Sequence, residues 1–299
     1  MILITGSSGF VGSCLVRRLT AAGLAVRGFA RRPTKTREAG LPKIALAAGS
    51  VRDPASLDLA MEGVGRVIHL VGILTESGRD TFEAIHHQGT RNVVDAALRA
   101  GVERFIHVSA LGTRPGAASR YHQTKWAAEE YVRHSGLDYT ILRPSVIFGP
   151  HDAFTNLFAR ILRFSPVLPI LGDGRALLQP IAVEDVAHCI QNALGNPDTI
   201  GRTYELGGPE RIPFQELLEI IARTLGKTPR PLHLPMPLLR LEAAVLERLL
   251  PRPPLTTDQL IMAQEDNICD IDPMERTFGL VPRDFREGIR EFLPGAKPL

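Results

Sequence analysis

The sequence has few cysteines, little excess charge and no long apolar segment. Its three cysteines, Cys14, Cys189 and Cys269, lie far apart and form no Cys-x-x-Cys pair, which favours buried thiols over a disulfide framework or a metal site. No uncharged apolar run approaches the roughly 18 residues that a membrane-spanning helix needs. A formal net charge of +3, without a Lys/Arg block longer than a pair, argues against nucleic acid as a partner.

The remaining composition is typical of a globular protein. The 299 residues, 44% hydrophobic and 22% charged, can bury one large core or two modest ones. An apolar strand pattern starts at the second residue and leaves no room for a signal peptide, so we expect a cytoplasmic protein that can be peripheral to a membrane. Five histidines do not have the spacing of metal ligands, and we expect most of them at the surface of strands or helices: His69, His86, His87, His107 and His122.

The first nineteen residues predict a nucleotide-binding turn. Residues 2–5 are typical of a short buried strand, and the apolar period of residues 10–19 predicts a helix. Between them, Gly6, Gly9 and Gly12 form a G-x-x-G-x-x-G turn. Such a turn points backbone N–H groups and the positive end of a helix at one spot, which suits a pyrophosphate. A tight turn without a ligand is the alternative.

Strand and helix patterns alternate along the first half of the chain. Strands are predicted at 24–30, 44–48, 67–71, 104–109 and 140–147, and helices at 53–61, 81–100 and 119–135. This alternation predicts an α/β fold with a doubly wound parallel Rossmann sheet. After Pro150 the chain is rich in proline and glycine, with helices predicted at 183–194 and 213–225 and a strand at 203–206. We expect residues 1–150, rejoined by 176–206, to form the nucleotide domain, and 151–175 with 207–299 to form a smaller, partly interleaved substrate or lid region.

The end of the second predicted strand carries two arginines. An acidic residue at this position would hold the ribose 2′-hydroxyl of NAD, but the chain has Arg31 and Arg32 there. Guanidinium groups match a 2′-phosphate, so the sequence favours NADP(H) over NAD(H). Two solvated surface arginines are the alternative.

Tyr121 and Lys125 are candidates for proton transfer. Four residues apart on a predicted helix, they share one face. An ammonium beside a phenol stabilises the phenolate and lowers the phenol's pKa, and the same lysine can hydrogen-bond a nicotinamide ribose. The helix follows the fifth strand, where the carboxyl edge of the sheet presents it to a cofactor.

These features together resemble a known superfamily. The glycine turn, the Tyr121–Lys125 pair and residues 142–149 (Leu-Arg-Pro-Ser-Val-Ile-Phe-Gly) resemble the extended and atypical short-chain dehydrogenase/reductases of the NAD-dependent epimerase/dehydratase superfamily. More narrowly, residues 105–112, 119–125, 149–152, 171–180 and 252–256 resemble the NAD(P)H-binding accessory subunit of respiratory complex I. The resemblance runs from Met1 to about residue 267. The match to the superfamily is more specific than the match to the complex I subunit.

The resemblance and the strand-end chemistry together assign a set of cofactor-binding residues. They are Gly6, Ser7, Ser8, Gly9, Phe10, Val11 and Gly12 of the turn, Arg31 and Arg32, Ser50 and Val51 at the adenine edge, Leu70, Val71 and Gly72, His86, Val108, Tyr121 and Lys125, and Pro144, Ser145 and Val146 against the nicotinamide. Ser50 stands where the family usually has an aspartate, and His86 stands where many members have an asparagine that braces the active-site backbone.

One catalytic position departs from the family pattern. The hydroxyl that usually polarises the substrate carbonyl falls on Ala110, and Ser109 lies one residue earlier. A shift of one residue on a strand turns the side chain to the other face of the sheet. We therefore expect the Ser109 side chain to point away from a substrate carbonyl, unless the strand end bends. Ser109 is kept as a catalytic candidate beside Tyr121 and Lys125, and nucleotide binding is better supported than turnover.

Residues 238–250 form a predicted amphipathic helix with a broad leucine-rich face. This helix can pack on the substrate region, or dock on a membrane surface or a respiratory-complex partner.

Three functions remain open for the chain. The chain can be an oxidoreductase that transfers hydride to or from a carbonyl, sugar-nucleotide or quinone-type substrate. The complex I resemblance implies instead a non-catalytic subunit or assembly factor that holds the nucleotide. The third is a quinone- or lipid-handling factor near a membrane.

Overall fold

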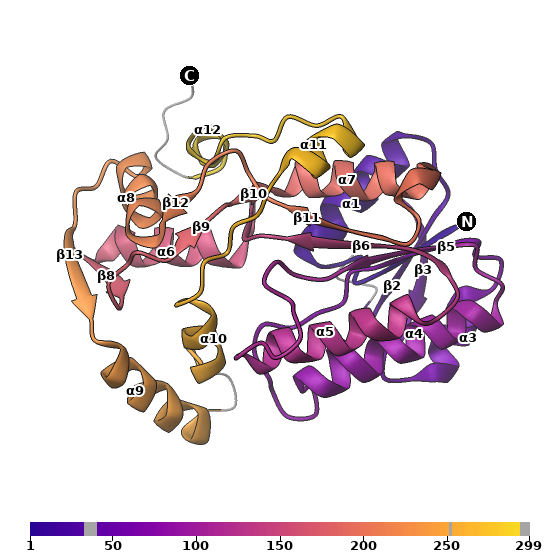
Figure 1. Cartoon of the computed structure of the whole chain (residues 1–299), viewed down its shortest axis with the longest axis horizontal. Coiled ribbons are helices and arrows are strands. Elements are labelled where there is room, and N and C mark those ends of the chain that lie inside the picture. Colours follow the sequence, from indigo (N-terminus) through magenta and orange to yellow (C-terminus); the bar gives the residue numbers. More distant parts are fainter. Residues whose placement is uncertain (33–40, 251–252, 294–299) are drawn as a thin grey trace.

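The computed structural model describes residues 1–32, 41–250 and 253–293. Its centre is a seven-stranded sheet in which every neighbouring pair is parallel, with the order β11-β6-β5-β4-β1-β2-β3 (Figure 1). The strands are β1 (Ile2–Thr5), β2 (Val26–Ala30), β3 (Ala45–Ala48), β4 (Arg66–His69), β5 (Arg104–Val108), β6 (Asp138–Pro144) and β11 (Arg202–Leu206). The strand order reverses between β1 and β4, where doubly wound sheets bind their ligands.

Helices cover both faces of this sheet (Figure 1). One face carries α3 (Pro54–Met61), η1 (Glu83–His87), α4 (Gln88–Arg99) and α5 (Arg120–Arg133), and the other carries α1 (Phe10–Ala21), α7 (Val183–Gly195) and α11 (Asp272–Phe278). Neighbouring strand residues belong to opposite cores: Leu3 packs on the α3–α4 side, while Ile4 packs on the α1–α7 side. Burial on both faces explains the continuous apolar strands, and the predicted Rossmann fold is confirmed.

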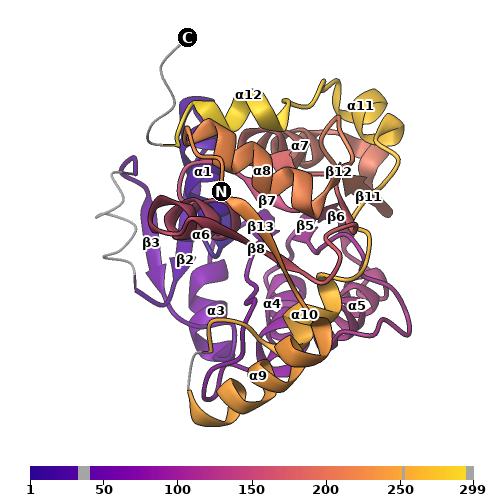
Figure 2. The same ribbon diagram turned by 90° about the vertical axis from the view of Figure 1, so that its left-hand side faces the viewer.

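A smaller lobe lies beside the carboxyl edge of the sheet (Figure 2). Its helices are α6 (Ala153–Phe164), α8 (Phe214–Thr224), α9 (Met236–Leu249), α10 (Thr257–Met262) and α12 (Phe285–Arg290), and a 3-10 turn, η2 (Pro197–Thr199), precedes β11. Short strands pair as β8 (Val167–Leu171) with β13 (Arg230–Leu234), β9 (Leu177–Leu178) with β12 (Ile212–Pro213), and β7 (Ile147–Phe148) with β10 (Ile181–Ala182). Phe148, Phe214, Leu217, Ile221 and Phe285 are part of its core.

Two details differ from the sequence expectations. The helix predicted over 81–100 begins with a π-helical turn at η1, which displaces its register before α4. The expectation that the histidines lie mostly at the surface is wrong, because His69, His86 and His107 are at most 1% exposed. His69 and His107 lie on the face of the sheet that η1, α4 and α5 cover, and His86 lies on the inner side of η1. Among the described residues, none of the helices is long and apolar enough to cross a membrane.

The cysteines agree with the sequence interpretation. All three are free thiols, with Cys189 and Cys269 buried and Cys14 half-buried. Burial raises the pKa of Cys14 to about 11 and that of Cys269 to about 12, so these thiols stay protonated at neutral pH. Nowhere in the described parts of the chain do three or more His, Cys, Asp or Glu side chains gather as they would around a metal ion.

Candidate functional site

The β1–α1 turn has the geometry of a phosphate-binding loop. Gly6 has φ +77°, which an L side chain rarely adopts, and its carbonyl accepts a hydrogen bond from the Gly9 N–H at 2.9 Å. A Cβ atom on Gly12 would lie only 2.2 Å from the Gly6 carbonyl oxygen. The glycines therefore let the first turn of α1 approach the loop closely, which leaves its N-terminal N–H groups available to a bound anion.

The other loop residues differ in exposure. Ser7 is fully buried and its Oγ has no hydrogen-bond partner among the described residues, whereas Ser8 is exposed. A buried hydroxyl without a partner is costly, and the Ser7 Oγ lies against β2, where a Cβ on Gly28 would come within 2.7 Å of it. Phe10 and Val11 are half-buried, and the Phe10 ring lies against Gly149 beyond β7. The loop thus fits a dinucleotide pyrophosphate in shape and in donors.

The ends of β2 and β3 form the predicted adenosine edge. Arg31 and Arg32 are exposed directly after β2, and Arg31 Nη1 donates to Asp80 Oδ2 at 2.5 Å. Ser50 N donates to Ser56 Oγ at 3.3 Å, and the buried Val51 offers its carbonyl to the Asn92 amide at 2.8 Å. These contacts hold the backbone of residues 50 and 51 in place, although Ser50 stands where the family usually has an aspartate.

The end of β4 forms a wall against the phosphate loop. A Cβ on Gly6 would lie 3.4 Å from Leu70 and from Val71, so the wall and the loop are in close contact. At Gly72 a Cβ would lie 3.3 Å from Lys125 Nζ and 3.7 Å from His86 Nε2. Gly72 therefore stands between the nucleotide loop and the candidate catalytic groups.

His86 braces this wall from η1. Its Nε2 lies 3.0 Å from the Ile73 N–H, and its Nδ1 lies 3.0 Å from Thr124 Oγ1 on α5. Burial, with the nearby Lys125 ammonium, lowers the pKa of His86 to about 2, so the ring is neutral. A neutral ring that accepts from Ile73 and donates to Thr124 satisfies both contacts. His86 thus ties the wall to the Tyr121 helix, as the asparagine at this position is expected to do.

Tyr121 stands in the first turn of α5 within an aromatic pocket. Its ring meets His86 edge-on at 5.1 Å between centroids, and it has similar contacts with Phe82 and His122. Burial raises the pKa of the Tyr121 phenol to about 12, which is the opposite of the lowering expected from a neighbouring lysine. The physical reason is that desolvation disfavours the phenolate, while the Lys125 ammonium donates to a backbone carbonyl.

Lys125 reaches into the sheet edge one turn further along α5. Its Nζ donates to the Val108 carbonyl oxygen at 3.2 Å, at the end of β5, and the residue is 4% exposed. Burial lowers the pKa of Lys125 to about 8, and the Glu129 carboxylate opposes that shift. The ammonium is therefore held between the ends of β4 and β5, beside Gly72.

The strand ends beyond Lys125 carry the remaining predicted residues. Ser109 is buried, and its Oγ has no hydrogen-bond partner among the residues that the structure describes. The Pro144 carbonyl accepts from Leu111 N at 2.9 Å, and the Val146 carbonyl accepts from Ile181 N at 3.0 Å. Ser145 Oγ donates to Asn267 Oδ1 at 2.6 Å, so this hydroxyl is already engaged.

Two functional contacts come from the second lobe and were missed in the sequence. Asp258 of α10 accepts from the N–H groups of Arg120 at 2.6 Å and Tyr121 at 3.1 Å, and so caps the helix that carries the candidate acid/base. Asn267 links Ser145 to the Leu111 carbonyl. The capping box of Thr256 and Gln259 marks the start of α10. Nothing in the sequence shows that Asp258, which lies between these two residues, caps a different helix.

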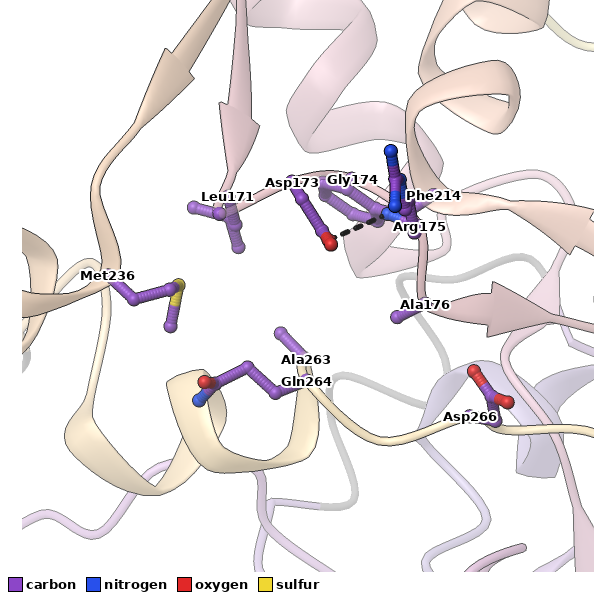
Figure 3. A pocket seen from close by; sticks show the side chains of 11 residues that line it. Leu171, Asp173, Gly174, Arg175, Ala176, Phe214, Met236, Ala263, Gln264 and Asp266 are labelled. Atoms are coloured by element: carbon purple, nitrogen blue, oxygen red, sulfur yellow. Dashed lines mark hydrogen bonds between the residues drawn. The ribbon is translucent and has the colours of Figure 1, made fainter.

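A cavity of about 540 Å³ opens in the second lobe (Figure 3). Apolar side chains line much of it: Leu171, Phe214, Met236 and the small Ala176 and Ala263. Asp173, Arg175, Gln264 and Asp266 supply its polar part, with the Asp173 carboxylate accepting from Arg175 N at 3.1 Å. The cavity is half open to solvent and has a mixed polar and apolar lining.

The parallel sheet and the glycine-rich turn are those of an NAD(P)H-binding protein. Residues 6–197 match the NAD(P)H-binding protein family, and the chain belongs to that family. Over 97% of its length the chain is 31% identical to the mitochondrial NADH dehydrogenase [ubiquinone] 1 alpha subcomplex subunit 9 of Arabidopsis thaliana, of which it covers 76%. The resemblance seen in the sequence is confirmed.

Two further proteins resemble the chain, one in sequence and one in fold. The chain is 32% identical to the ceramide reductase of Caulobacter vibrioides, over 79% of this chain and 74% of that protein. Its fold matches the solved structure of the UDP-glucose 4-epimerase of Thermus thermophilus in complex with NAD, with a TM-score of 0.74, 23% identity, and coverage of 99% and 98%. This second likeness supports the fold alone.

Proposed function

We propose that the chain is an NADP(H)-dependent oxidoreductase that transfers hydride to or from a carbonyl-type substrate. The observation that carries the proposal is the placement of Lys125, whose buried ammonium is held beside Gly72 at the carboxyl edge of the sheet, one helical turn from Tyr121. The test of this proposal is to offer the protein and NADPH a panel of long-chain ketones, quinones and sugar nucleotides, and to measure NADPH oxidation by the absorbance of the nicotinamide. Consumption of NADPH above the rate without substrate is expected for one class.

The residues divide the work of such a reaction. NADP(H), when bound, supplies or accepts the hydride. Gly6, Gly9 and Gly12 hold the pyrophosphate, and the Lys125 ammonium orients the nicotinamide ribose. The Tyr121 phenol, whose pKa burial raises from 10.0 to about 12, is protonated at neutral pH and gives its proton to the substrate oxygen during reduction. Ser109 is the remaining candidate for polarising that oxygen.

The preference for NADP(H) rests on the β2 end. Arg31 and Arg32 follow Ala30 there, both exposed, with no acidic residue at the position that holds a ribose 2′-hydroxyl in NAD enzymes. Two guanidiniums offer donors that fit three phosphate oxygens.

Replacing both arginines tests the cofactor preference. In Arg31→Ala with Arg32→Ala, we expect NADPH affinity to fall about 10- to 100-fold, because charge-assisted hydrogen bonds to the 2′-phosphate are lost. NADH lacks that phosphate, and its affinity should change less than about twofold. Fluorescence titration of both nucleotides measures the two losses. Equal losses would remove the 2′-phosphate assignment.

The substrate side belongs to the second lobe. Its cavity combines the apolar Leu171, Phe214 and Met236 with the charged Asp173 and Arg175 (Figure 3). We infer a substrate with an apolar part and a polar group, a class to which the substrate named for the ceramide reductase relative belongs. In this proposal residues 1–150 with 176–206 hold the nucleotide, and 151–175 with 207–299 shape the substrate site, except for α11, which packs on the sheet beside α7.

A second function is favoured by the surface of α9. Leu238, Leu241, Val245 and Leu249 are between 46% and 72% exposed on one side of the helix, while Leu239 and Ala243 are buried on the other. An unpartnered stripe of this kind favours an interaction site. With a complex I subunit among the relatives, we infer that the chain also works at the cytoplasmic surface of a membrane, docked through residues 238–250 on a respiratory-type complex or on lipid.

The stripe gives a direct test of docking. Leu241→Gln with Leu249→Gln should weaken retention in the membrane fraction about 100-fold, because each buried leucine contributes roughly 1.5–3 kcal/mol. Since both side chains are exposed, the thermal midpoint and the nucleotide affinity should stay unchanged. Leu59→Gln on α3, 69% exposed, is the matched control. Retention that is equal in all variants would leave α9 without a docking role.

A further inference from the structure

The adenosine edge holds a further arginine, Arg52, that the sequence motifs do not reveal. Arg52 follows β3 by four residues, and Arg31 follows β2 directly. These two strands are parallel neighbours, with Ala30 paired to Ala48, so both guanidiniums start from the same edge of the sheet. This is the edge at which an adenosine ribose binds in a doubly wound fold.

Both arginines converge on one carboxylate. Arg31 Nη1 lies 2.5 Å from Asp80 Oδ2, and Arg52 Nη1 lies 3.5 Å from Asp80 Oδ1, so each guanidinium takes a different oxygen. Arg52 Nη1 also donates to the Arg79 carbonyl oxygen at 2.7 Å, which fixes the arginine to the same turn. The site is therefore a two-arginine anion site filled by a side chain of the protein.

The turn that carries Asp80 is itself well defined. Ser77 and Asp80 exchange two backbone hydrogen bonds of 3.0 Å, and Gly78 between them has φ +58°. The Asp80 side chain is 26% exposed, against 36% for Arg52 and 67% for Arg31. Ion pairs this open to solvent are weak, so a stronger anion can displace the carboxylate.

A phosphate monoester is such an anion. It carries more charge than a carboxylate and has three acceptor oxygens for the two guanidiniums. A ribose 2′-hydroxyl is neutral and gains little from them. Exchange at this site therefore separates NADP(H) from NAD(H) by charge.

We propose that Arg31 and Arg52 form the 2′-phosphate site and that Asp80 is its internal competitor, which NADP(H) must displace. The proposal rests on the proposed NADP(H) function and deepens it. Asp80 thereby limits the preference for NADP(H): it withdraws both guanidiniums from the phosphate, while it leaves the pyrophosphate loop untouched. Arg52 is a specificity-determining residue in addition to the strand-end pair.

Nucleotide titration of Asp80→Asn tests this without any substrate. Removing the competing charge should raise the ratio of NADPH to NADH affinity about two- to fivefold, the range set by an exposed ion pair. Arg52→Ala should weaken NADPH about tenfold and NADH less than twofold. Asp58→Asn, which breaks the exposed Arg99–Asp58 pair between α4 and α3, is the matched control and should leave the ratio unchanged.

The outcomes separate this inference from the proposed function. An unchanged or lower ratio of NADPH to NADH affinity in both Asp80→Asn and Asp80→Ala overturns the role of Asp80 as a competitor. Equal losses of NADPH and NADH affinity in Arg52→Ala overturn the role of Arg52 in binding the 2′-phosphate. Failure of the wild-type chain to bind either nucleotide overturns the proposed function itself. Titration with 2′-AMP and 5′-AMP repeats the comparison on fragments, where only 2′-AMP should respond to Asp80.

Discussion

Gly12→Ala should weaken nucleotide binding strongly. The added Cβ would lie 2.2 Å from the Gly6 carbonyl oxygen and 2.8 Å from the Ser7 Cα, and both are backbone atoms that cannot rotate away. The loop must then open, and its N–H groups no longer converge on the pyrophosphate. Losing two hydrogen bonds to a charged group, at roughly 1.5–3 kcal/mol each, weakens binding at least about 100-fold. Isothermal titration with NADPH measures this.

Gly65→Ala is the matched control for that substitution. A Cβ there meets no heavy atom within 4 Å and the residue has no positive φ, so NADPH affinity should remain as in the wild type. Circular dichroism shows whether the Gly12 variant keeps its fold. A folded Gly12→Ala protein with wild-type affinity would refute the phosphate-loop assignment.

Tyr121→Phe should lower the rate of hydride transfer about 100- to 10,000-fold, the usual contribution of a positioned proton donor. The phenylalanine ring keeps the edge-on contacts with His86 and Phe82, and Lys125 keeps its bond to Val108. Nucleotide affinity should therefore change less than about twofold. Single-turnover oxidation of bound NADPH, with whichever substrate class is active, gives the rate.

Tyr139→Phe controls for the loss of a hydroxyl as such. The Tyr139 hydroxyl donates to the Gly201 carbonyl at the exposed end of β6, away from the α5 site, so its loss should leave the rate intact. An unchanged rate in Tyr121→Phe would remove this residue from proton transfer and favour the nucleotide-holding function.

Several features follow from the sequence because they depend on local spacing. The strand pattern of residues 2–5, the glycines that follow and the period of α1 determine the phosphate loop within nineteen residues. The four-residue interval from Tyr121 to Lys125 places both on one face of α5. Regular alternation of strands and helices determines the doubly wound sheet.

Only the tertiary structure determined the contacts between distant segments. Asp80 pairs with arginines 49 and 28 residues earlier, and Asp258 caps α5 from 137 residues away. Such pairings depend on how loops far apart in the sequence meet in the fold, which no local period encodes. Burial likewise set the pKa of Tyr121 and the neutrality of His86, because desolvation reflects every element packed around a group. The sequence by itself predicted where a nucleotide binds, because the glycine-rich turn is a local pattern, and only the packing of the second lobe and the turn at Asp80 determined which groups surround that place.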